Sequence, residues 1–225
     1  MSLNLSWWKQ NWVRVLWSVI GLLVLLFFVR VIVWEHDYYT GKEGSERATA
    51  PITSDVDETD VSDDDKAEYT VAPDRPRYLS IEKLNIKNSR VIPVGLTKEG
   101  ALDTPSSIFD TAWYTASAKP GTGGTLLMNG HNGGPTKNGV FKNLPDLVKG
   151  DIIIIERGDG QIFKYAVADT QTIALDQSDN YMSTAQQSPE KGKESLTLIT
   201  CTGTWSQAQQ TYLSRQFVRA VLISE

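Results

Sequence analysis

From residue 73 onward, the chain is a succession of short apolar stretches separated by Gly, Pro, Asn and Asp, and this pattern constrains the fold most. The candidate strands are residues 77–81, 84–86, 90–94, 125–129, 151–156, 161–167, 196–201 and 216–223. An Asp-Gly turn at residues 157–160 joins two of these stretches, which is typical of a β-hairpin. Only residues 140–147 have the apolar spacing of a helical turn. The pattern therefore predicts an all-β barrel or sandwich.

A long apolar run near the N-terminus has a different character. Residues 15–34 would form a helix of about 30 Å, the thickness of a bilayer's hydrocarbon core. Tryptophans precede the run, Trp34 is its last residue, and two tyrosines follow it, as in an aromatic belt. Lys9 and Arg14 lie before the run, so the positive-inside rule places residues 1–14 in the cytoplasm and the rest outside.

The alternative for this run is a cleaved signal peptide. The run is too long for one, and the small-residue site at residues 48–50 lies well beyond its end. We therefore expect an uncleaved single-pass anchor in the cell membrane, with residues 15–34 as the transmembrane helix.

An acidic segment follows. Between residues 40 and 72 there are ten acidic and three basic residues, a balance of −7, so the remainder of this −5 chain carries about +2. Few apolar groups are present to offset ordering entropy. We expect residues 35–72 to be a disordered extracytoplasmic linker. Without a basic stripe in the rest of the chain, we expect no nucleic-acid partner.

Two side chains in residues 73–225 are candidates for chemistry. Cys201, the chain's only cysteine, ends the apolar stretch TLITC where a strand opens into a loop. It could be buried and inert, paired with another molecule, or a reactive thiol. His131 follows another candidate strand and could be an ordinary exposed loop histidine or an acid–base group. The second histidine, His36, lies at the membrane boundary and is not a candidate.

The stretch TLITC matches the TL-x-TC signature of the sortases at every fixed position. Further stretches resemble sortase landmarks: residues 92–96 with 100–102, residues 112–114 with 120–121, residues 129–131, and the F-x-x-L-x-x-L-x-x-G-D run of residues 141–151. The resemblance covers residues 77–224 and is closest to the single-barrel enzymes of classes D, E and F. No long lid with an Asp-Pro-Trp/Phe-type plug precedes the barrel, which favours a type other than the pilin-polymerising one.

This resemblance implies a sortase-type eight-stranded β-barrel with short helical turns, forming a catalytic domain over residues 73–225. It also implies a cysteine transpeptidase that anchors surface proteins to the cell wall. Cys201 would attack a sorting-signal peptide, and His131 would protonate the departing amine. An amine acceptor, either a cell-wall precursor or a pilin lysine, would resolve the thioacyl enzyme.

The third catalytic group is either Arg215 or Arg219. The two lie four residues apart, so they share one face of a strand about 13 Å apart. If their strand pairs antiparallel with the one that ends at Cys201, Arg215 lies nearer the thiol, and the family pattern also fits it. The alternative for each arginine is a surface position. The hydroxyl of Thr200 is a further candidate for supporting the oxyanion.

The L,D-transpeptidases place Gly before the cysteine and Arg two residues after it, whereas Thr200 and Gly203 stand at these positions. A non-enzymatic, membrane-tethered adhesin or pilin-like module with an incidental thiol is the alternative to an enzyme. We see no metal-ligand cluster and expect no cofactor.

Overall fold

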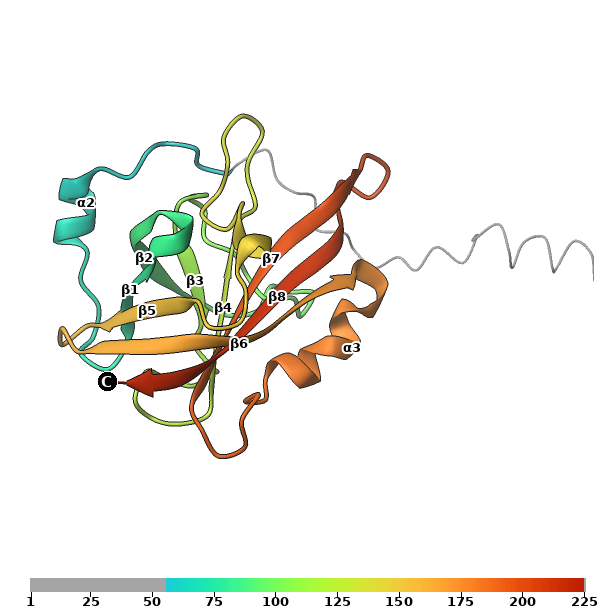
Figure 1. The fold of residues 1–225 in the computed structure, drawn as a ribbon. Coiled ribbons are helices and arrows are strands. Elements are labelled where there is room, and N and C mark those ends of the chain that lie inside the picture. Colours follow the sequence, from blue (N-terminus) through green and yellow to red (C-terminus); the bar gives the residue numbers. More distant parts are fainter. Residues whose placement is uncertain (1–55, 225) are drawn as a thin grey trace, which may run out of the picture. The chain divides into compact units, whose positions relative to one another are not determined.

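Eight strands form a closed barrel in the computed structural model, which describes residues 56–224 (Figure 1). They are β1 (Pro76–Ile81), β2 (Ile86–Val94), β3 (Thr111–Tyr114), β4 (Thr125–Gly130), β5 (Ile152–Arg157), β6 (Ile162–Ala174), β7 (Ser195–Ser206) and β8 (Thr211–Ser224). Their order around the barrel is β1-β2-β3-β4-β7-β8-β6-β5, and β5 closes onto β1. The predicted all-β, eight-stranded barrel is confirmed.

Most neighbouring strands are antiparallel, but β2–β3 and β4–β7 are parallel pairs. The predicted hairpin at residues 157–160 joins β5 to β6. The parallel pairing of β4 with β7 is the important one for the candidate site, because its ladder ends at Asn129 and Ile199, just before His131 and Cys201. His131 directly follows β4, whereas Cys201 lies within β7, so the prediction that this strand opens into a loop at Cys201 is wrong.

Within residues 56–224, four short helices accompany the strands: α2 (Asp63–Glu68), η1 (Glu82–Leu84), η2 (Leu144–Asp146) and α3 (Leu175–Ala185). The predicted helical turn at residues 140–147 contains η2. The helix α3 lies on the connection between β6 and β7 and has contacts with both β6 and β8. Figure 1 shows it against the outside of these strands.

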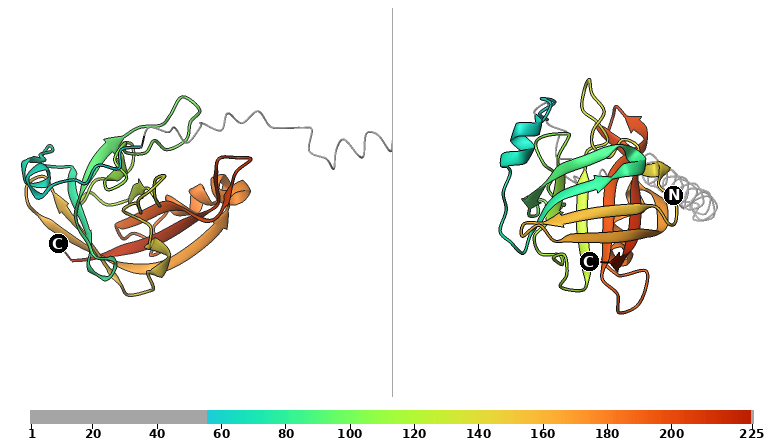
Figure 2. Two further views of the ribbon diagram at one scale, coloured as in Figure 1. Left: turned by 90° about the horizontal axis from the view of Figure 1, so that it is seen from above. Right: turned by 60° about the vertical axis from the view of Figure 1, so that its left-hand side comes forward.

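Alternate residues of each central strand face two different apolar clusters. Leu126, Leu196 and Leu198 belong to the larger cluster inside the barrel, which the strands surround (Figure 2). Leu127 and Ile199 belong to a smaller cluster beneath α3. Since successive side chains of a strand alternate in direction, Cys201 lies on the same side as Ile199, the outer one.

The acidic segment is ordered from residue 56, so the prediction of a disordered linker is wrong for residues 56–72. Ser62 caps α2: its Oγ accepts from the backbone N–H of Asp65 at 3.0 Å, and the Asp65 carboxylate accepts from the N–H of Ser62 at 3.1 Å. Tyr69 then donates its hydroxyl to the Val91 carbonyl at 2.6 Å. Composition indicated charge repulsion, whereas several of these carboxylates and Tyr69 make specific hydrogen bonds.

The predicted membrane anchor at residues 15–34, with the segments 1–14 and 35–55 on either side of it, lies outside the described residues. Within residues 56–224, no helix has the length and apolar character needed to cross a membrane.

Candidate active site

Three of the predicted site residues lie side by side at one level: Cys201 on β7, Arg215 on the adjacent β8, and His131 directly after the adjacent β4. In the antiparallel pair of β7 and β8, Cys201 is the cross-strand partner of Arg215. In the parallel pair of β4 and β7, the last registered partners are Asn129 and Ile199, so two further residues bring His131 level with Cys201. Neighbouring strands are about 4.8 Å apart. The thiol therefore has His131 on one flank and Arg215 on the other.

These three positions also share one side of the sheet. Cys201 follows Ile199 by two residues, Arg215 precedes Phe217 by two, and both apolar residues belong to the outer cluster beneath α3. His131 has the same relation to β4, four residues after Leu127 of that cluster. The period of two then directs all three candidate side chains to the outer side, beyond the end of the apolar cluster.

Cys201 is a free thiol and is half-buried. Burial raises the pKa of this thiol above its ordinary value, and the positive charge of Arg215 offsets part of that rise. Desolvation disfavours the thiolate and a nearby cation favours it. The thiol is consequently protonated in most molecules at neutral pH, and it needs a proton acceptor before it can attack.

The ring of His131 is held by one hydrogen bond. Its Nε2 lies 2.7 Å from the carbonyl oxygen of Pro105. A carbonyl only accepts, so Nε2 carries the hydrogen and Nδ1 has the lone pair of a neutral ring. No partner for Nδ1 is recorded among residues 56–224, which leaves this nitrogen for proton exchange. Asn129, on the same side of β4, donates its Nδ2 to the Asp103 carbonyl at 2.9 Å, so the 103–105 segment is bound twice.

The structure distinguishes the two arginines. The guanidinium of Arg215 donates to the carbonyl of Tyr212 at 2.9 Å and to that of Ser214 at 3.1 Å, at the start of β8. Arg219 is the partner of Thr197, four residues before Cys201. The predicted register, with Arg215 nearer the thiol, agrees with this arrangement.

Arg219 is not the ordinary surface residue that we allowed for. Its Nε and Nη2 form a bidentate ion pair with the carboxylate of Asp169 on β6, at 3.0 and 2.6 Å. Its Nη1 also donates to the Thr184 carbonyl of α3 at 3.3 Å. Arg219 thus joins β8 to β6 and to the end of α3. These contacts are structural, and none of them involves the thiol.

The hydroxyl of Thr200 does not face the candidate active site. Its side chain is buried, and Oγ1 donates to the Gly130 carbonyl at 2.8 Å. Because Thr200 alternates with Cys201 along β7, it faces inward, and its hydrogen is already used between β7 and β4. The expected support of an oxyanion by this hydroxyl therefore has no basis in the geometry.

Sequence reasoning missed Asn132, which touches the backbone of the candidate nucleophile. Its buried side chain donates Nδ2 to the carbonyl of Cys201 at 2.8 Å, and its Oδ1 accepts from Nζ of Lys142 at 3.3 Å. The backbone ladder of β4 and β7 ends three residues earlier, at Asn129. Asn132 therefore continues the connection between the two strands beyond their ladder. Its only signal in the sequence is its place directly after His131.

Comparison with known families and structures agrees with this fold. A family model described as the Sortase domain matches residues 79–223, more than half of the chain. Sortase C of Streptococcus pneumoniae is 20% identical, with 75% of each chain covered and a TM-score of 0.50. Sortase C2 of pilus island 1 from Group B Streptococcus is 18% identical over 69% of this chain and 77% of that one, with a TM-score of 0.50. No curated protein sequence matched the chain.

Proposed function

This chain belongs to the sortase family, and we propose that it is a cysteine transpeptidase with Cys201 as nucleophile. One observation carries the assignment: Cys201, His131 and Arg215 lie on or directly after three adjacent strands, at one level and on one side of the sheet. A thiol, an imidazole and a fixed cation in this order supply the nucleophile, the acid–base group and the anion-stabilising group of acyl transfer.

Acylation begins with proton transfer from the Cys201 thiol to Nδ1 of His131. The sulfur then attacks the scissile carbonyl carbon of a peptide, and the charge of Arg215 stabilises the oxyanion that forms. The protonated His131 gives its proton to the leaving nitrogen as the C–N bond breaks. The products are a thioester on Cys201 and a free amine from the C-terminal part of the peptide.

A second amine completes the reaction. It attacks the thioester carbon and loses a proton to the neutral ring of His131. The C–S bond then breaks, and His131 gives this proton to the leaving sulfur, which restores the thiol and the neutral ring. A new amide is formed and no water is consumed. The acyl donor in this proposal is the sorting signal of a surface protein, and the acceptor is a cell-wall precursor or a pilin lysine.

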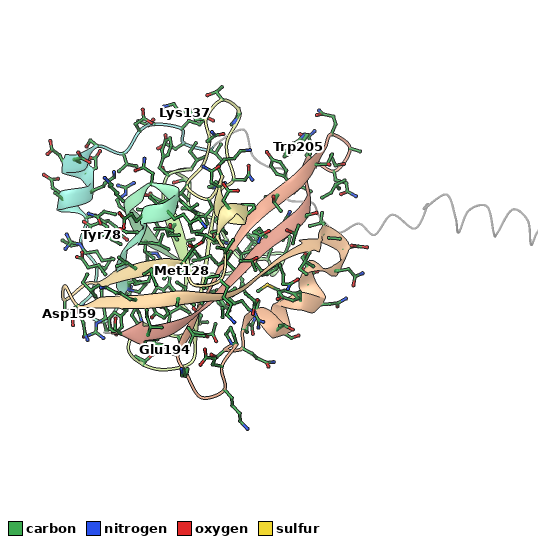
Figure 3. The ribbon with its side chains drawn as sticks, in the orientation of Figure 1. Tyr78, Met128, Lys137, Asp159, Glu194 and Trp205 are labelled. Atoms are coloured by element: carbon green, nitrogen blue, oxygen red, sulfur yellow. The ribbon has the colours of Figure 1, made fainter. Side chains whose placement is uncertain are left out.

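The surroundings of the thiol suit an extended peptide. Beyond Cys201, β7 and β8 continue as a long hairpin, on which Trp205 and Tyr212 pack edge to face with ring centroids 5.2 Å apart (Figure 3). Trp205 and Leu213 keep 38% and 40% of their surface exposed. Exposed apolar groups on the hairpin that carries the thiol would provide contact area for a substrate. Anchoring through residues 15–34 would keep this surface near the membrane, where secreted proteins emerge.

A direct test is capture of the acyl enzyme. The full-length protein would be incubated with a library of peptides carrying varied sorting-signal sequences, without and with an added amine. We expect one peptide class to add its acyl mass to the protein, and the amine to remove it. Cys201→Ala should form neither adduct nor product, and product formation by this variant would refute the assignment.

The non-enzymatic alternative, a tethered adhesin or pilin-like module, makes the opposite prediction for the thiol. An incidental buried cysteine should resist a mild electrophile in the native protein and react only after unfolding. We expect Cys201 to react in the native state, and to be protected by an acyl-donor peptide that the library identifies.

A further inference from the structure

Residues 57–60, which we call the strap, contact the loop that follows His131. The carboxylate of Glu58 accepts hydrogen bonds from the backbone N–H groups of Thr136 and Lys137, at 2.8 and 3.0 Å, and from the Thr136 hydroxyl. Asp60 adds an ion pair, with its Oδ1 3.0 Å from Nζ of Lys137. Figure 3 labels Lys137 at the tip of this loop, beside the N-terminal segment. The Glu58 carboxylate thus accepts three hydrogen bonds at the turn of the 132–139 loop, and Asp60 adds a fourth contact.

The strap also holds a second loop. The N–H of Asp57 donates to the Ser106 carbonyl at 2.8 Å, and the N–H of Ile108 donates to the Asp57 carbonyl at 3.0 Å. These two bonds form a short parallel bridge with residue 107. The strap therefore lies across both loops and connects them.

Both loops bear directly on His131. The first contains Pro105, whose carbonyl accepts from Nε2 of the imidazole. The second begins at His131 itself and returns to it, since the N–H of Phe141 donates to the His131 carbonyl at 3.0 Å. The ring is therefore held by one loop and the backbone by the other. The strap joins these loops from outside, in addition to the direct bond that the Val140 N–H donates to the Ile108 carbonyl at 2.8 Å.

We propose that the strap positions His131 for catalysis and that Glu58 is its main positioning residue. This inference rests on the proposed function, because a fixed orientation of the His131 ring matters for catalysis only if His131 is the acid–base group. Glu58 does not touch the reacting atoms. It acts by fixing the loop after His131 relative to the loop that holds Nε2, and a loose imidazole transfers protons poorly.

The attachment of the strap is polar, so it can be removed without damage to the core. The helix α2, which follows the strap, has no buried residue. A cavity of about 320 Å³ lies next to the strap, lined among others by Asp60, Val61 and Phe109. Hydrogen bonds from the Thr136 hydroxyl, and then from the backbone, lower the pKa of Glu58 below its ordinary value. Its carboxylate is accordingly charged at neutral pH and able to hold the loop.

The loop offers an independent way to disturb the same contact. A Cβ atom added to Gly134 would meet the carboxylate of Glu58, which is the movable end of a side chain. Gly134→Ala should therefore displace Glu58 from the turn without touching the strap's own sequence. Asp64→Asn is a matched control. Asp64 is an exposed carboxylate of α2 with no recorded hydrogen bond among the described residues, so the substitution removes the same charge nearby.

The test uses the full-length protein labelled with ¹⁵N-histidine. The chain has two histidines, and His36→Gln leaves the signals of His131 alone. For Glu58→Ala, Glu58→Gln and Gly134→Ala, we expect kcat for acylation to fall about tenfold with little change in KM. We also expect the Nε2–H signal of His131 to exchange faster with water. Asp64→Asn should change neither quantity.

The outcomes separate this proposal from the proposed function. Unchanged His131 signals and unchanged kcat in the Glu58 variants, with only a lower melting temperature, would reduce the strap to a structural element and overturn the proposal. A rise in kcat would also overturn it, since the strap would then be inhibitory. If the wild-type protein acylates no peptide, the proposed function fails, and the His131 signals still decide whether the strap orders the imidazole.

Discussion

Cys201 and Arg215 are direct cross-strand partners in the antiparallel ladder of β7 and β8. Partners in such a ladder have Cα atoms about 4.5–5.5 Å apart, so the two side chains leave the sheet side by side. Burial raises the pKa of the Cys201 thiol, and the positive charge of Arg215 lowers it. Under the proposed function, this cation beside the thiol is the group that would stabilise the oxyanion of acyl transfer.

The first prediction concerns this cation. Arg215→Lys keeps the charge but loses the planar set of donors, so stabilisation of the oxyanion should weaken. We expect the acylation rate to fall about 10²–10³-fold, or roughly 2.7–4 kcal/mol, as for other losses of an oxyanion donor. Single-turnover acylation with a peptide substrate measures this directly.

Arg219→Lys is the matched control on the same strand. It should leave the acylation rate within a fewfold of wild type, because Arg219 is the partner of Thr197, far along β7 from the thiol. It should instead lower stability by about 1 kcal/mol through loss of one of the two bonds to Asp169. If Arg219→Lys abolishes acylation and Arg215→Lys acylates at nearly the wild-type rate, Arg219 and not Arg215 is the oxyanion-stabilising residue.

Much of this barrel could be predicted because its strands have local signals. The Asp-Gly turn at residues 157–160 identified the hairpin of β5 and β6. The alternation in TLITC identified β7, and antiparallel pairing with the next strand then placed Arg215 beside Cys201. The register of two paired strands follows from the alternation of their side chains and from the turn between them, so it can be predicted from the sequence.

What escaped prediction depends on contacts between distant segments. Asn132 is bonded to Cys201, 69 residues away, and no local pattern marks that bond. Glu58 likewise binds residues 136 and 137. Composition described the acidic segment as repulsive, although the carboxylates of Asp57, Glu58 and Asp65 are hydrogen-bonded in the fold. For Thr200, the presence of a hydroxyl suggested support of an oxyanion. Alternation along β7 directs this side chain inward, where the hydroxyl donates to the Gly130 carbonyl instead.

The second prediction concerns Asn132. Asn132→Ala removes the donor to the Cys201 carbonyl and leaves that carbonyl without this partner, so the nucleophile should lose its fixed position relative to His131. A lost hydrogen bond of this kind is worth about 1 kcal/mol. We expect kcat for acylation to fall about tenfold. Asn138→Ala, in the same loop, should not change it, and equal effects of both variants would contradict a specific role for Asn132.

The third prediction concerns the acidic segment. Deleting residues 1–72 should leave a folded barrel that melts at a lower temperature than a protein lacking only residues 1–55. The shorter fragment loses the Tyr69 hydroxyl bond to Val91 and the Tyr69 carbonyl that accepts from Arg77 at 2.7 Å. Each kcal/mol lost lowers the midpoint by roughly 2–4 °C for a domain of this size. Thermal unfolding by circular dichroism measures the difference.

Tyr69→Phe in the longer fragment isolates one part of that effect, because it removes the hydroxyl and keeps the ring beside Tyr78. It should account for part of the loss only. Identical melting of the two fragments would mean that the contacts of residues 56–72 add nothing to the stability of the barrel.

The last prediction concerns the pH dependence of the thiol. Because burial raises the pKa of Cys201, alkylation by iodoacetamide should reach half its maximal rate at a higher pH than for an ordinary thiol, whose pKa is about 8.5. The thiolate is the reacting form, so the rate rises with pH through the thiol pKa. Arg215→Gln removes the cation that favours the thiolate, and the half-maximal pH should move higher still. Arg215→Lys keeps a cation and should move it less. A half-maximal pH below that of a short TLITC peptide would show that the resting enzyme holds a stabilised thiolate, and the protonated thiol assumed for the first step of acylation would then be wrong.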